Sequence, residues 1–180
     1  ALLHRNIKIF NSKKNLHLVS PSNWLGEKIK KTYNLPLSVI PNPIDGRASL
    51  NTSCSSNNRQ ILFLHNSKDY HKGYDLLERA LEEVSAEHDI ELVTIIRNIK
   101  KDVKFKVKEI NYLHDENEVL ALISSVRMVA VPSRVDNYPN ICLEALKCNV
   151  PVVAFAIGGI PEIVSHKKTG YLANPFDTSD

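Results

Sequence analysis

Residues 129–144 read VAVPSRVDNYPNICLE, an apolar run followed by a polar loop and then by a second apolar stretch. The run from Val129 to Val131 is typical of a short buried strand. The segment after the loop predicts a helix over 138–148. A buried strand that leads into a helix is the repeating unit of an α/β fold with a parallel sheet.

Two acids bracket the predicted start of that helix. Asp136 lies in the loop, and Glu144 follows eight positions later. At the rise of an α-helix the two carboxylates would stand on the order of 12 Å apart along the axis, with the exposed amides of the helix start between them. This layout suits a nucleotide sugar, because the positive helix end can take a diphosphate while the acids bind ribose and sugar hydroxyls.

The alternation of apolar runs and amphipathic stretches extends over residues 60–180. It predicts strands at 61–65, 90–96, 103–107, 128–132, 151–155 and 170–173, and helices at 73–86, 116–125, 138–148 and 160–165. We therefore expect a Rossmann-like α/β fold, in which helices cover both faces of a parallel sheet. Ligands of such sheets bind at the carboxyl ends of the strands, and Asp136 follows one of them.

The beginning of the chain has a separate pattern. It predicts a strand that ends at Ser20, a helix from Ser22 to about Tyr33, and a strand at 37–40. Residues 51–58 are polar and low in complexity. We therefore place a flexible linker at 46–59, between a first segment of residues 1–45 and a domain of residues 60–180.

The composition fits a soluble chain with one sizeable core, at 180 residues, 43% hydrophobic, 24% charged and a net charge of +3. No stretch approaches the roughly 18 apolar residues of a membrane span. The three cysteines form no disulfide framework, which favours a cytoplasmic location. Residues 1–45 carry a charge of +5. We expect a solvated basic face, with peripheral contact with the inner face of an anionic membrane as the alternative. No nucleic-acid-binding signature occurs.

Six short motifs follow one another along the chain. They are SPSNWL at 20–25, VIPNPID at 39–45, HKG at 71–73, PSRVDNYPNICLEAL at 132–146, PVVAFAIGGIPEIV at 151–164 and TGYL at 169–172. In this order they resemble family 4 (group 1) of the retaining glycosyltransferases, which have the GT-B fold. The resemblance covers the donor-binding C-terminal half of that fold, preceded by a remnant of the acceptor-side domain.

The resemblance implies that a sugar passes from a nucleotide-diphosphate sugar to a hydroxyl of a glycan or lipid-linked acceptor, with retention of configuration. It implies bacterial polysaccharide or glycolipid synthesis, with no metal and no other cofactor. Catalytic roles fall to Asp136, on the sugar hydroxyls, and to Lys72, on the leaving diphosphate. The implied substrate-binding residues are Glu144 on the ribose, and Lys68, Asn137, Tyr138 and Asn140.

The chain departs from the family pattern at three places. The family usually has Glu, Gly, an aromatic residue and Gly at 136–139, where this chain has DNYP, so that the first acid is shorter and Pro139 lacks an amide donor. Asn66 and Ser67 replace the family's Gly-Arg, which leaves Lys68 as the candidate stand-in for the arginine. The glycine-rich loop expected near residue 97 reads Arg-Asn, so base recognition stays open.

Other interpretations remain beside these. Lys72 could be an exposed lysine at a helix start, Glu144 a solvent-facing residue, and Gly158-Gly159 a tight turn. The chain could be a nucleotide-sugar-binding module without activity, a GT-B nucleotide-sugar isomerase or a nicotinamide-dependent dehydrogenase. No Gly-x-Gly-x-x-Gly follows the strand at 61–65, which argues against the dehydrogenase. The histidines lack the spacing of a metal site.

Overall fold

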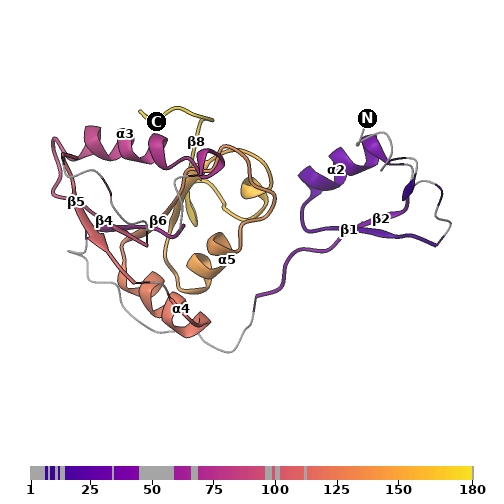
Figure 1. The fold of residues 1–180 in the computed structure, drawn as a ribbon, viewed down its shortest axis with the longest axis horizontal. Helices are drawn as coiled ribbons and strands as arrows, with labels where there is room; N and C mark the ends of the chain where they lie inside the picture. The colour runs from indigo at the N-terminus through magenta and orange to yellow at the C-terminus, as the bar shows by residue number, and fades with distance from the viewer. Residues whose placement is uncertain are drawn as a thin grey trace. The chain divides into compact units, whose positions relative to one another are not determined.

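The structure is a computed structural model that describes residues 7, 9, 10, 12, 15–33, 35–44, 59–65, 69–95, 99, 102–111 and 113–179. The chain divides into two compact units, Ala1–Pro43 and Ile44–Asp180. Both are drawn in Figure 1, and each is considered by itself.

The first unit contains a strand, a helix and a parallel strand. β1 (Leu18–Ser20) pairs with β2 (Leu37–Val39), and α2 (Asn23–Thr32) connects them. The hydroxyl of Ser22 caps α2 by accepting a hydrogen bond of 3.1 Å from the Leu25 amide. The helix is buried at Gly26, where a Cβ atom would lie 3.2 Å from the side chains of Leu37 and Val39. These elements confirm the strand, helix and strand predicted here.

The second unit contains a six-stranded parallel sheet with the strand order β5-β4-β3-β6-β7-β8. The strands are β3 (Gln60–Phe63), β4 (Glu91–Thr94), β5 (Lys106–Glu109), β6 (Met128–Val131), β7 (Val152–Phe155) and β8 (Gly170–Ala173). The helices are α3 (Tyr74–Val84), α4 (Glu116–Ser125) and α5 (Asn140–Lys147), with two 3₁₀ turns, η1 (Tyr70–Lys72) and η2 (Ile160–Glu162).

Helices lie on both faces of this sheet. Leu62 of β3 belongs to a core that includes Ile123 of α4 and Ala145 of α5. The next residue, Phe63, belongs to a separate core with Leu77 of α3. Alternate residues of one strand point to opposite faces, so α3 covers one face while α4 and α5 cover the other (Figure 1). The predicted Rossmann-like α/β fold is confirmed.

The direction of sheet growth reverses next to β3. β4 and β5 follow β3 on one side, and the chain then returns to place β6, β7 and β8 on the other side. β3 and β6 are therefore neighbours, although α3, β4, β5 and α4 separate them in sequence. Such a reversal opens a crevice at the carboxyl ends of the two strands, where ligands of doubly wound sheets bind.

Two predicted elements differ from the structure. The helix predicted at 160–165 is only the 3₁₀ turn η2, because the chain turns at Ser165, whose carbonyl oxygen accepts hydrogen bonds from the Lys168 and Thr169 amides, and Lys167 has a left-handed φ of 61°. The strand predicted near 103–107 begins later, at Lys106, because Lys106 pairs with Glu91, the first residue of β4, and the ladder between the two strands starts there. None of the helices in the described part of the chain has the length and apolar character needed to cross a lipid bilayer.

Candidate functional site

A small cavity lies at the carboxyl ends of β3 and β6, where the strand order reverses. Its volume is about 50 Å³, and its polar lining comes from His65, Lys72, Ser133 and Asp136. His65 follows β3, whereas Ser133 and Asp136 follow β6. The topology therefore brings two of the predicted site residues, Lys72 and Asp136, to the rim where a ligand is expected.

The η1 turn positions Lys72. The Asp69 carboxylate accepts a hydrogen bond of 2.9 Å from the His71 amide and so begins the turn. Gly73 ends it with a φ of 70°, and a Cβ atom there would overlap the carbonyl oxygen of Pro132. Only glycine fits this close approach at a left-handed φ. Lys72 thus ends a 3₁₀ turn, and α3 starts two residues later.

Asp136 is held by hydrogen bonds to one carboxylate oxygen. Lys72 Nζ lies 2.8 Å from Asp136 Oδ2, and Ser133 Oγ donates to the same oxygen over 3.2 Å. The side chains of Lys72 and Asp136 are 34% and 13% exposed, so the pair is partly desolvated. Within the described ranges, Oδ1 accepts no hydrogen bond.

Two glycines fix the main chain of Asp136. The Gly159 amide donates to the Asp136 carbonyl oxygen over 3.1 Å. Gly158 has a φ of 59°, and a Cβ atom there would overlap the same carbonyl. The tight turn considered for Gly158-Gly159 is present, and it also places the loop that carries Asp136.

Glu144 is a half-buried residue in the middle of α5. Burial raises the pKa of its carboxyl group, Glu116 raises it further, and Lys147 opposes both. Lys147 itself pairs with Glu116 at 3.7 Å. Among the residues that the structure describes, the Glu144 carboxylate has no hydrogen bond or ion pair. A carboxylate in this position gains free energy from any hydroxyl group that reaches it.

The charges of Lys72, Asp136 and Glu144 all act on the thiol of Cys142. Burial raises its pKa to about 12, Asp136 and Glu144 add to the rise, and Lys72 opposes it. Cys142 is fully buried on α5, so it is an inert core residue. Two acids and one cation therefore act electrostatically on one point inside the start of α5, a helix that no side chain caps.

Three further predicted site residues lie before or at the start of α5. Asn137 and Tyr138 are half-buried, and Asn140 is the exposed first residue of α5. Lys68 lies outside the described residues, as does the Arg97-Asn98 pair. In the described ranges, no group of His, Cys, Asp and Glu has the arrangement of a metal site.

Three residues near the site were not among the predicted site residues. His65 and Ser133 line the cavity. Arg134 forms a bidentate pair with Asp75, at 2.7 Å and 2.6 Å, across a sequence separation of 59 residues. Periodicity and local motifs carry no information about such a separation. The available signal for Ser133 and Arg134 is that they belong to the motif at 132–146 and precede Asp136 in it.

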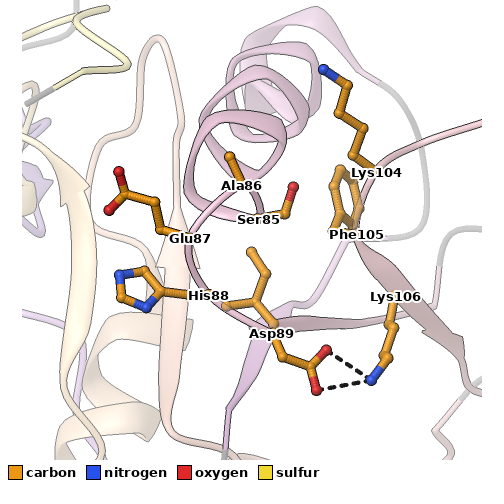
Figure 2. A pocket seen from close by; sticks show the side chains of 9 residues that line it. Ser85, Ala86, Glu87, His88, Asp89, Lys104, Phe105 and Lys106 are labelled. Atoms are coloured by element: carbon orange, nitrogen blue, oxygen red, sulfur yellow. Dashed lines mark hydrogen bonds and ion pairs between the residues drawn. The ribbon is translucent and has the colours of Figure 1, made fainter.

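A larger groove lies at the amino ends of β4 and β5, and Figure 2 shows the side chains that line it. It has a volume of about 450 Å³ and is lined by residues 85–90, before β4, and 104–106, at the start of β5. The ion pair of Asp89 and Lys106 at 2.7 Å lies at this groove, with both side chains more than half exposed. None of the predicted site residues lines it. Its size alone does not make it the ligand site.

Solved structures share this architecture, and a curated relative shares part of the sequence. The UDP-glucose complex of Anabaena HepE superposes with a TM-score of 0.76 at 20% identity, covering 98% of this chain and 54% of that one. An S. aureus TarM variant in complex with fondaparinux, α-GlcNAc-glycerol and UDP gives 0.76 at 16% identity, covering 98% and 38%. A protein in the cps region of Klebsiella pneumoniae is 29% identical over 165 residues, which are 84% of this chain and 43% of that protein.

These likenesses identify the sheet as half of a GT-B fold. The chain spans about half, or less, of the length of these proteins. Residues 58–180, more than half of the chain, match the family model described as glycosyl transferases group 1. The chain belongs to this family of glycosyltransferases.

Proposed function

We propose that this chain binds the nucleotide-diphosphate-sugar donor of a retaining glycosyltransferase at the carboxyl ends of β3 and β6. The observation that carries the proposal is the ion pair of Lys72 and Asp136 at the point where the strand order reverses. A partly buried cation and a carboxylate with one unused oxygen suit a ligand that has both phosphate groups and hydroxyl groups.

The diphosphate of the donor would replace Asp136 as the partner of Lys72. Lys72 Nζ and Asp136 Oδ2 are 2.8 Å apart, so an arriving phosphate oxygen competes with the carboxylate for the same ammonium group. Once released, Asp136 can accept hydrogen bonds from sugar hydroxyls. A cavity of about 50 Å³ is smaller than the roughly 300 Å³ of ligand pockets, so this exchange would also open the site.

Glu144 would bind the ribose. Its half-buried carboxylate lacks a partner in the described part of the chain, and its pKa is raised mainly by burial. Two ribose hydroxyls would each supply a charge-assisted hydrogen bond of about 1.5–3 kcal/mol. The main-chain amides at Asn140 would face the diphosphate, since no side chain caps α5. Asn137, Tyr138 and Lys68 would complete the contacts with the donor.

The proposed chemistry is charge stabilisation on the leaving diphosphate. Negative charge grows there as the glycosidic bond breaks. Among the described residues, Lys72 is the cation that lines the cavity, and it would stabilise this charge. We propose that neither a metal nor another cofactor is required. The acceptor would be a hydroxyl of a glycan or lipid-linked chain. The Klebsiella relative supports a bacterial polysaccharide role. A cytoplasmic location and peripheral contact of residues 1–45 with anionic lipid stay predictions.

A binding panel tests the proposal. Thermal unfolding of the 180-residue chain is measured with UDP, GDP, ADP and their glucose conjugates, and with the corresponding nucleosides as controls. At 100-fold its dissociation constant, a true ligand stabilises the protein by about 2.7 kcal/mol. We expect one nucleotide series to stabilise the chain and its nucleoside to do so far less. Equal midpoints throughout the panel would refute donor binding.

A second candidate is a donor-binding module that has no transferase activity by itself. The observation that favours it is that this chain spans only 54% of HepE and 43% of the Klebsiella protein. Approximation of donor and acceptor can lower a barrier by about 7–11 kcal/mol, and that contribution requires both binding sites. Sugar transfer by this chain, measured beside the complete enzyme, separates the two candidates.

A further inference from the structure

Arg134 connects the loop after β6 to the turn that carries Lys72. Its Nη1 atom donates to the Tyr70 carbonyl oxygen over 2.8 Å, and both of its terminal nitrogens donate to the Asp75 carboxylate. Its guanidinium carbon lies 3.9 Å from the centre of the Tyr70 ring. We call these side-chain contacts the Arg134 clamp.

The contacts of the Arg134 clamp restrict its geometry. The Arg134 side chain is only 14% exposed, although that of Asp75 is 57% exposed. A bidentate arginine–carboxylate pair fixes orientation as well as distance, and stacking on Tyr70 fixes the plane of the guanidinium. The hydrogen bonds from Arg134 lower the pKa of Asp75 below its usual range. Asp75 also lies in the first turn of α3, where a negative charge is favoured.

The clamp joins the two segments that meet at the candidate site. Tyr70 begins the η1 turn and Lys72 ends it. Arg134 precedes Asp136 by two residues in the loop after β6. A rigid link between Tyr70 and Arg134 therefore restricts how Lys72 and Asp136 can move relative to each other.

We propose that Arg134 is a positioning residue for donor binding, which it serves by fixing Lys72 in register with Asp136. This inference rests on the proposed donor site. Arg134 has no assigned contact with the donor, so its effect must pass through Lys72 and Asp136. The residue therefore differs from a substrate-binding arginine, which would act whether or not Lys72 were present.

The fold does not depend on the clamp alone. The Arg134 amide donates to the His71 carbonyl oxygen over 2.8 Å, and Gly73 packs against Pro132. Neither contact involves the Arg134 side chain. We therefore expect Arg134→Gln to fold, with a looser Lys72 turn, which makes the variant usable in binding experiments.

The test is a double-mutant cycle with Lys72, read as the dissociation constant of UDP by calorimetry. Arg134→Gln should weaken UDP binding about tenfold when Lys72 is present, and less than about twofold in a Lys72→Ala background. Arg134→Lys keeps the charge but lacks the planar fork, so its affinity should stay near that of Arg134→Gln. Equal losses in both backgrounds, or full affinity in Arg134→Lys, would overturn the proposal.

Two controls accompany the cycle. One tests whether lower stability alone weakens UDP binding, and the other tests the Arg134 clamp without any ligand. Ile123→Val, in the buried core on α4, lowers stability without touching the site and should leave UDP affinity unchanged. Hydrogen exchange, which needs no ligand, should show faster exchange of the Lys72 amide in Arg134→Gln. That amide donates to the Asp69 carbonyl over 2.9 Å.

Each negative outcome of these measurements refutes a different part of the proposal. If the wild-type chain does not bind UDP at any accessible concentration, UDP as the donor nucleotide is refuted, and hydrogen exchange still decides whether Arg134 fixes the turn. Unchanged exchange at Lys72 in Arg134→Gln refutes the clamp itself. If UDP binds and the losses of affinity from the two substitutions are additive, the donor site is supported and the positioning role of Arg134 is refuted.

Discussion

The two ends of the sheet in the second unit differ in size and in chemistry. At the amino ends of β4 and β5 lies a groove of about 450 Å³, whereas at the carboxyl ends of β3 and β6 lies a cavity of about 50 Å³. The groove has an ion pair between side chains that are 60% and 64% exposed, but the pair in the cavity is 13% and 34% exposed. Since partial desolvation strengthens an electrostatic interaction, the smaller hollow has the greater capacity to recognise a charged ligand.

The backbone shows the same difference. At the carboxyl end, Gly73 and Gly158 have positive φ and approach main-chain carbonyls of the loop after β6. Among the described residues, the groove is reached by an ordinary turn after α3, without positive φ. Two of the five described residues with positive φ, Gly73 and Gly158, thus contact the loop that carries Asp136, whereas the other three, Asn149, Lys167 and Phe176, lie elsewhere in the fold.

The largest expected effect is on stability at the carboxyl end. Gly73→Ala adds a Cβ atom at a φ of 70° that would overlap the Pro132 carbonyl. We expect the free energy of unfolding to fall by about 3 kcal/mol, because strain and overlap add. Urea unfolding measures the change, and Ala86→Ser in the exposed turn at the groove is the control. A loss in Gly73→Ala no larger than that in Ala86→Ser would contradict the close approach.

The second-largest effect is expected on UDP affinity when Lys72, the proposed partner of the diphosphate, is removed. Lys72→Ala should weaken UDP binding by about 2–3 kcal/mol but leave uridine binding nearly unchanged, because only UDP has the diphosphate. The difference should shrink as salt rises, since the Debye length falls from about 10 Å at 0.1 M. Calorimetry at two salt concentrations measures both quantities. Parallel losses for UDP and uridine would remove Lys72 from the phosphate site.

Glu144→Gln should change stability and affinity in opposite directions. In the folded state the pKa of Glu144 is raised above 4.5, so the folded protein binds the proton more tightly than the unfolded chain does. Its contribution to stability is therefore lost as pH rises through the folded pKa, and at pH 7 the glutamine variant should be the more stable one. UDP binding should nevertheless fall by about 1–3 kcal/mol, because the ribose loses a charged acceptor.

Urea unfolding between pH 4 and pH 7, with UDP calorimetry at pH 7, measures both effects. The wild-type protein should lose stability relative to Glu144→Gln as the pH rises over this window. A variant with lower stability and unchanged affinity would return Glu144 to a structural role.

Local pattern was enough to predict the elements but not their partners. The helix at 116–125 and the strand at 170–173 were predicted at their observed bounds, because apolar spacing is a property of the segment itself. Lys72 and Asp136 are 64 residues apart, and Arg134 and Asp75 are 59 apart. These pairs exist because β3 and β6 are neighbours, which depends on the order of strands in the sheet.

The positions of the acids were predicted better than their interactions. The sequence placed Asp136 in a loop and Glu144 on a helix, and the structure agrees. That Lys72 donates to Asp136 follows from how the η1 turn meets the loop after β6. That Glu144 lacks a partner in the described ranges follows from how α5 packs on α4 and on β6 and β7. The helix predicted at 160–165 was wrong because hydrogen bonds between Ser165 and Thr169 turn the chain there, and local periodicity does not show such a turn.

The smallest effect is expected at the groove, and it decides whether the two ends are separate in function. Lys106→Gln removes the cation that lowers the pKa of Asp89, chiefly through a side-chain hydrogen bond. We therefore expect the pKa of Asp89, followed by NMR, to rise toward 3.8. Because Lys106 lies at the amino end of β5, UDP affinity should not change.

Any contribution of this ion pair to stability is lost as pH falls through the lowered pKa of Asp89. The free energy of unfolding should therefore change less between pH 7 and pH 3 in the variant than in the wild type. A tenfold loss of UDP affinity in Lys106→Gln would mean that the nucleotide contacts the groove, and the donor site would have to be placed at the amino ends of β4 and β5.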